Sequence, residues 1–125
     1  MADYTELFPL GAGDWTSQAS ATITGGQLLA VSGSGTVAPA GLTSLTVVGV
    51  AGHDAASGAK VTVKPLKMVH ETTAGSGGIT AGNPLKSDAS GNVMAWVAGT
   101  DSSAAFIGVA LNTATATNPV QWIGR

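Results

Sequence analysis

The sequence contains one pattern twice, and this duplication limits the folds that the chain can adopt. Residues 23–40 read ITGGQLLAVSGSGTVAPA, and residues 79–96 read ITAGNPLKSDASGNVMAW. Ile, Thr, Gly, Leu, Ser, Gly and Val recur at the same places, each 56 positions later. Short apolar runs separated by glycine-containing turns are typical of β-hairpins. The duplication therefore predicts two equivalent hairpin units.

The later part of each copy also matches. Gly49 in the run LTVVGVAG corresponds to Gly108 in the run AAFIGVALN, 59 positions later. The loop before Gly108 is therefore three residues longer than the loop before Gly49. The alternating strand KVTV at 60–63 then corresponds to PVQW at 119–122.

These matches predict repeat one over 23–64 and repeat two over 79–123. Residues 1–22, which resemble neither copy, are expected to form an N-terminal arm and a first strand. An isolated small sheet is only marginally stable, because one of its faces stays unpacked. The two copies are therefore expected to close on each other, share one core and form a single β domain over 23–125.

The residue types predict an all-β fold, a small barrel or sandwich built from the two repeats. The 18 glycines are spread through the chain, and each would cost about 1 kcal/mol relative to Ala inside a helix. One short helical turn at 52–59 is the alternative to strand or loop. Strands are predicted near 18–24, 28–32, 45–51, 60–64, 66–71, 84–87, 92–97, 104–111 and 119–123.

Six glycines are candidates for a structural role. Those in the turns can take a positive φ, which other residues adopt with strain. Those inside strand-like runs mark a bend, a bulge or the close approach of another backbone. The turn glycines are Gly26, Gly35, Gly82 and Gly91, and the strand glycines are Gly49 and Gly108.

Composition excludes several classes of function. Only 10% of the residues are charged, against roughly 25% in a typical soluble domain. With five Lys and Arg and a net charge of -2, the chain lacks the basic surface that nucleic-acid binding requires. No apolar run approaches the ~20 residues of a membrane span, and the N-terminus lacks the layout of a signal peptide. Neither a nucleic acid nor a membrane is an expected partner.

The sequence offers no recognisable catalytic or metal-binding motif. His53 and His70 are each followed by a carboxylate, but neighbours on a strand point to opposite faces. The chain contains no cysteine, and its glycine-rich runs lack the Lys that follows in a phosphate-binding loop. We therefore expect no enzyme activity, no metal and no cofactor.

Large apolar residues gather in the first ten positions, outside the repeats. A terminal segment is usually disordered unless something holds it. The arm is therefore expected to pack on its own barrel, or to lie on a neighbouring subunit or another partner. The candidate contact residues are Tyr4, Leu7, Phe8, Pro9 and Leu10.

The order of these elements resembles the small capsid decoration proteins of tailed phages, also called cement or head-stabilising proteins. The resemblance runs from Gly13-Asp14-Trp15 through SATITGGQLLAVSGSGTVAPAG, ITAGNPLKSDASGNV and FIGVALNTA, and covers about 13–123. It implies a non-enzymatic protein, made in the host cytoplasm and placed on the capsid exterior of the virion. There it would bridge and stabilise copies of the major capsid protein, as a homo-oligomer and most readily a homotrimer.

Two other functions stay open at this point. A carbohydrate- or receptor-binding module would need an exposed aromatic platform, for which Trp96 and Trp122 are the candidates. A small-molecule or ice-binding protein is suggested by the alternating run Thr113-Ala114-Thr115-Ala116-Thr117.

Overall fold

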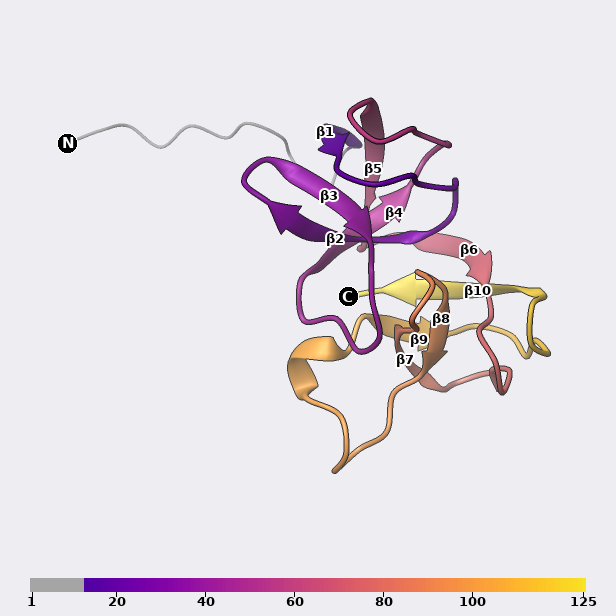
Figure 1. Ribbon diagram of the computed structural model, residues 1–125. Coiled ribbons are helices and arrows are strands. Elements are labelled where there is room, and N and C mark those ends of the chain that lie inside the picture. The colour runs from indigo at the N-terminus through magenta and orange to yellow at the C-terminus, as the bar shows by residue number, and fades with distance from the viewer. Residues whose placement is uncertain (1–12) are drawn as a thin grey trace.

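Apart from one short 3₁₀ turn, the regular secondary structure is β-strand, which confirms the predicted all-β fold (Figure 1). This computed structural model describes residues 13–125. The first half contains β1 (Trp15–Ala19), β2 (Leu28–Gly33), β3 (Thr36–Pro39), β4 (Val47–Ala51) and β5 (Lys60–Pro65). The second half contains β6 (Val69–Thr73), β7 (Pro84–Ser87), β8 (Val93–Ala95), β9 (Gly108–Ala110) and β10 (Pro119–Gly124), with one 3₁₀ turn, η1 (Ser103–Ala105).

The two halves follow the same path. The first forms a closed barrel in the order β1-β3-β2-β4-β5, and the second forms a sheet in the order β6-β10-β9-β7-β8. Replacing each strand of the barrel by the strand five places later gives the ring β6-β8-β7-β9-β10, and the second sheet has the same neighbours but is open between β6 and β8. Where Ala19 of β1 pairs in parallel with Val37, Ala74 makes an isolated parallel bridge to Val93. The fold is therefore two similar sheets in sequence, each curled around its own interior.

Each structural unit contains one strand more than the repeat seen in the sequence. β1 runs antiparallel to β5, and β6 runs antiparallel to β10 in the same way. The two first strands share little sequence, which is why residues 1–22 showed no match to a second copy. The strand predicted at 18–24 lies at Trp15–Ala19 instead.

Two other strand predictions were wrong in detail. No strand was predicted at β3, whose sequence TVAP is short and ends in a proline, yet Pro39 pairs with Leu29 at the end of the ladder. A strand was predicted over 104–111, but β9 covers only Gly108–Ala110. The residues before it form η1, in which the Ser102 hydroxyl accepts a hydrogen bond from the Ala104 N–H at 3.2 Å.

The interior consists of two hydrophobic clusters rather than the single shared core that was expected. One fills the barrel and contains Leu29, Val37, Val61 and Val63, among others. The other fills the second unit and also takes in side chains from the outer face of the barrel. Leu28 belongs to that second cluster, so it and Leu29 point to opposite faces of β2 and are both fully buried.

Hydrogen bonds also join the two halves directly. The Leu28 N–H donates to the Gly91 carbonyl at 2.7 Å, and the Gln27 side chain donates to the Ser90 carbonyl at 3.0 Å. On the other side, the buried Ser87 hydroxyl donates to the Gly41 carbonyl at 2.7 Å and accepts from the Ser44 N–H at 3.0 Å. Every partner on the first half lies in β2 or in a loop beside it, so this side of the barrel is the main contact with the second unit.

Equivalent glycines have equivalent backbone geometry. The turn glycines Gly26 and Gly82 both have φ of 89°, and Gly35 and Gly91 both have φ of 76°. Inside the strands, a Cβ on Gly49 would overlap the Lys64 carbonyl, and a Cβ on Gly108 would overlap the Ile123 carbonyl. The fourth strand of each unit thus crosses close to the fifth, and only a residue without a side chain fits there.

Replacing Gly108 by Ala should therefore destabilise the protein strongly. The new methyl group would meet the Ile123 carbonyl and the buried Trp122 ring, so we expect a loss of about 1–3 kcal/mol or more in the free energy of unfolding, measured by urea titration. Gly41→Ala is the matched control, because a Cβ at Gly41 meets nothing within 4 Å, and it should change the stability by less than about 0.5 kcal/mol. Equal stability of the two variants would contradict this account of the strand crossing.

Candidate docking surface

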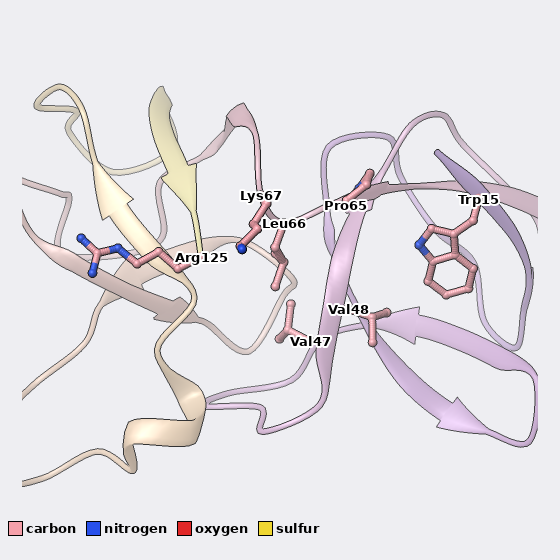
Figure 2. A pocket seen from close by; sticks show the side chains of 7 residues that line it. All are labelled: Trp15, Val47, Val48, Pro65, Leu66, Lys67 and Arg125. Carbon is pink, nitrogen blue, oxygen red and sulfur yellow. The ribbon is translucent and has the colours of Figure 1, made fainter. Parts of the chain in front are cut away.

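An apolar groove lies where the two halves meet (Figure 2). Its volume is about 370 Å³. It is bordered by the start of β1, the start of β4, the segment that links β5 to β6, and the C-terminal residue. The lining side chains are Trp15, Val47, Val48, Pro65, Leu66, Lys67 and Arg125.

The Trp15 end of the groove is held by β1. Trp15 pairs with Val63 across the β1–β5 ladder, and its ring packs against the barrel cluster while staying half-buried. The preceding residue, Asp14, forms an ion pair with Lys64 at 2.7 Å. An exposed pair of this kind adds little stability, but here it extends the β1–β5 contact by one residue toward the groove.

The linker wall of the groove is held by His70. Its Nε2 lies 2.8 Å from the Pro65 carbonyl and 3.2 Å from the Leu66 carbonyl. Because both partners can only accept, Nε2 carries the proton and donates. The ring also packs on the buried Trp122, with the ring centroids 4.8 Å apart. Burial lowers the pKa of His70 below its ordinary value of 6.5, with a smaller contribution from the positive charge of Lys64, so the ring is neutral near pH 7.

The basic end of the groove is held by the longer loop of the second unit. Lys86 forms a largely buried ion pair with Asp101 at 2.7 Å. The same carboxylate accepts the Val97 N–H at 2.7 Å, and these two hydrogen bonds, that from Lys86 first, lower the pKa of Asp101. The loop leads to Phe106, and the Arg125 guanidinium lies over its ring at 5.6 Å from the centroid.

The sequence prediction did not single out the groove as a site. Trp15 was noted only as a large aromatic residue, and Val47-Val48 only as part of a strand. The signal that was present is the break in alternation at Val47 and Val48, which are both half-buried. The pairing of β4 with β2 shifts register beside them, and this irregularity turns both side chains toward the groove.

The predicted contact residues Tyr4, Leu7, Phe8, Pro9 and Leu10 lie outside the described residues. The six candidate glycines lie at the two kinds of position given above, the turns and the strand crossings. His53 is exposed in a turn, where its ring bonds to backbone atoms of Asp54 and Thr62.

The aromatic platform suggested for glycan binding does not exist. Trp122 is fully buried, with its indole N–H bonded to the Thr72 hydroxyl at 3.0 Å. Trp96 is half-buried, with its indole N–H bonded to the Ser102 carbonyl and its ring packed edge-on against Phe106. The threonine run at 113–117 is not a flat ladder either, because it lies in the turn between β9 and β10.

No group of three or more His, Asp or Glu side chains that could hold a metal ion occurs within residues 13–125. A second hollow, of about 420 Å³, is lined by polar groups such as Thr24, Gln27 and Asn92, and Glu71 is its one ionisable side chain. A single carboxylate is not a general acid–base pair. The same part of the chain includes no helix that is long and apolar enough to cross a membrane.

Comparison with known proteins identifies the family of this chain. A family model described as phage cement protein matches residues 11–123. The chain belongs to the phage cement protein family. Members of this family are structural proteins of the phage capsid, so the virion capsid is where this cement protein is located.

One similar solved structure is the N-terminal base of the head fiber protein gp8.5 of bacteriophage phi29. It has a TM-score of 0.69 and 22% sequence identity, and the match covers 90% of this chain and 93% of that chain. At 22% identity, this similarity shows a shared fold alone. No curated protein sequence matches the chain.

The stability of the protein should fall when His70 becomes protonated. Since its folded-state pKa lies below 6.5, the unfolded chain binds the proton more readily. The free energy of unfolding should therefore be undiminished above pH 6.5 and should decrease below it, by at most about 1.4 kcal/mol per pH unit from this group. Urea titrations between pH 7.5 and about pH 5 measure the slope.

His70→Gln is the test variant, because an amide N–H can still donate to the Pro65 carbonyl but does not titrate. It should have a flatter pH dependence than the parent protein. An unchanged slope in His70→Gln would show that another group is responsible.

Proposed function

We propose that this cement protein binds the outer surface of the assembled capsid and bridges neighbouring copies of the major capsid protein. Its membership of the cement family is the observation that carries the proposal. The bound protein would resist outward movement of the subunits it joins, and so stabilise the head. Its role is mechanical, with no catalytic step.

The surface formed by residues 13–125 is suited to contact with another protein. Only 10% of the residues of the sequence are charged, so few charges must be desolvated when another protein covers this surface. Leu42 and Leu45, on the loop between β3 and β4, are 61% and 59% exposed. The Ser87 bonds to Gly41 and Ser44 hold this loop in place, so both leucines are presented on a fixed backbone.

We further propose that the arm supplies a separate contact and that the protein acts as a homotrimer. Tyr4, Leu7, Phe8, Pro9 and Leu10 are the arm residues assigned to the capsid or to a neighbouring subunit. Three arms on one rigid trimer would bind together, and avidity can exceed the affinity of one contact by about 10²–10⁴-fold. A weak individual contact then suffices for stable decoration.

Removing residues 1–12 should abolish this gain without unfolding the body. Both hydrophobic clusters are formed by residues beyond this segment, so circular dichroism should show an unchanged β spectrum. Co-sedimentation with expanded empty capsids measures how much protein is bound at each concentration. The apparent affinity obtained from it should be at least about 100-fold lower than that of the full-length protein. Full-length protein with Leu7→Ser, Phe8→Ser and Leu10→Ser is the matched variant that keeps the chain length. Full decoration by both variants would rule out the arm contact, and light scattering of the free protein tests the trimer.

A further inference from the structure

We propose that the apolar groove is the binding site of the chain's own N-terminal arm, with Leu7, Phe8 and Leu10 packed on Val47, Val48 and Leu66. In this proposal Leu7, Phe8 and Leu10 hold the arm on its own chain, and Tyr4 with the residues before it is left to contact the capsid. This narrows the arm contact of the proposed function, and it rests on that function only for what the arm does on the capsid. Five features of the described residues and of the sequence support it.

The first feature is the direction of the chain. β1 pairs antiparallel with β5, from Gln18 opposite Lys60 to Trp15 opposite Val63. The Asp14–Lys64 ion pair continues this register by one residue. Continuing it further places Gly13 beside Pro65 and residue 12 beside Leu66. The chain before β1 is therefore directed along the linker and into the groove, without a turn.

The second feature is that the other half of the molecule already contains this arrangement. The segment before β6 lies along the end of β10, where the Gly124 N–H donates to the Met68 carbonyl at 3.1 Å. Leu66, in this segment, packs against the second hydrophobic cluster and comes so close that a Cβ on Gly124 would overlap its carbonyl. Trp15 and His70 are equivalent in the two ladders and lie 55 positions apart, so the counterpart of Leu66 before β1 is residue 11, next to Leu10. The arm beside Leu10 would thus take, against the barrel, the place that the Leu66 segment takes against the second unit.

The third feature is the match of apolar surfaces. The middle of the groove is formed by Val47, Val48 and Leu66 with the Trp15 ring at one end (Figure 2). The arm presents the apolar run LFPL at 7–10. Burying one such side chain is worth about 1.5–3 kcal/mol, so two or three of them offset a large part of the entropy lost when the arm is ordered.

The fourth feature is charge. Lys67 and Arg125 lie on the groove away from Trp15 (Figure 2), and neither forms an ion pair within residues 13–125. The arm carries Asp3 and Glu6 beyond its apolar run. An arm that enters beside Trp15 and runs along the linker brings its acidic residues toward the two cations.

The fifth feature is length. Residues 7–12 span about 20 Å when extended, at roughly 3.3–3.6 Å per residue. Pro9 favours this extended form, because it fixes its own φ and biases the preceding Phe8 away from the helical region. An arm held in this way would present its first residues, including Tyr4, in a fixed position, which lowers the entropic cost of binding the capsid.

Disulfide trapping in the full-length protein tests the proposal directly, because the chain has no cysteine of its own. The two test variants are Leu10→Cys with Val48→Cys, and Phe8→Cys with Val47→Cys. The matched control is Leu10→Cys with Val31→Cys, since Val31 is exposed on β2 and does not line the groove. A disulfide requires Cα atoms within about 7 Å, so rapid oxidation reports that the arm lies in the groove.

We expect a cross-link within one chain in at least one test variant, at least tenfold faster than in the control. A cross-link between two chains, seen as a covalent dimer, would overturn the proposal in favour of the arm of a neighbouring copy. Slow oxidation in both test variants would overturn docking altogether. The measurement uses free protein, so it stands apart from the capsid assay. Trapping in the free protein together with full capsid binding by the arm variants would overturn the capsid contact alone, and no trapping together with lost capsid binding would overturn docking alone.

A charge exchange provides a second measurement. Glu6→Lys and Lys67→Glu, each added singly to the test variant that cross-links faster, should slow oxidation. The two together should restore much of the rate, because the attraction is re-formed with its sign reversed. Equal rates in all four proteins would remove the charge argument and leave docking dependent on the apolar contacts alone.

Discussion

Burial of both faces of β2 is the constraint on which the rest of this molecule depends. Leu28 and Leu29 are neighbours in the chain, yet one belongs to the core of the second unit and the other to the core of the barrel. Successive side chains on a strand point to opposite faces, so a strand can serve two cores only if it is covered on both sides. The second unit covers the outer face, and the Leu28–Gly91 and Gln27–Ser90 hydrogen bonds fix its position.

The groove follows from this packing. Two curled sheets that meet along one side must diverge elsewhere, and the linker from β5 to β6 crosses the resulting gap. His70 keeps Pro65 and Leu66 in place by donating to both carbonyls, which satisfies backbone groups that water would otherwise need to reach. The wall of the groove is thus held in place by a buried side chain of the second unit.

The sequence was sufficient to predict the class of fold and the equivalence of the two hairpins, because turn glycines and apolar residues recur at fixed spacing. It was not sufficient to predict the first strand of each unit. Trp15 and His70 occupy equivalent places in the ladders, opposite Val63 and Trp122, but a half-exposed tryptophan and a buried histidine share no pattern. Their equivalence is set by backbone pairing, which tolerates many side chains.

The candidate site was harder to predict for a related reason. Its lining comes from four separate segments, and each of them reads in isolation as ordinary strand, linker or terminus. The resemblance to phage cement proteins identified the class of partner, whereas the shared core that was expected gave no reason to look for a space between two separately curled sheets. The arm contacts stay a prediction, and the register of β1 against β5 is the observation that relates the arm to this space.

The pairing of β1 also determines how the protein would carry a tensile load. A pull on the N-terminal segment acts along β1, and the ladder bonds of an antiparallel pair lie across that direction. The bonds from Trp15 to Gln18 are then loaded together in shear, and they do not open one after another as they would if the strand were peeled from its end. A load applied before β1 would therefore be shared by the whole β1–β5 ladder.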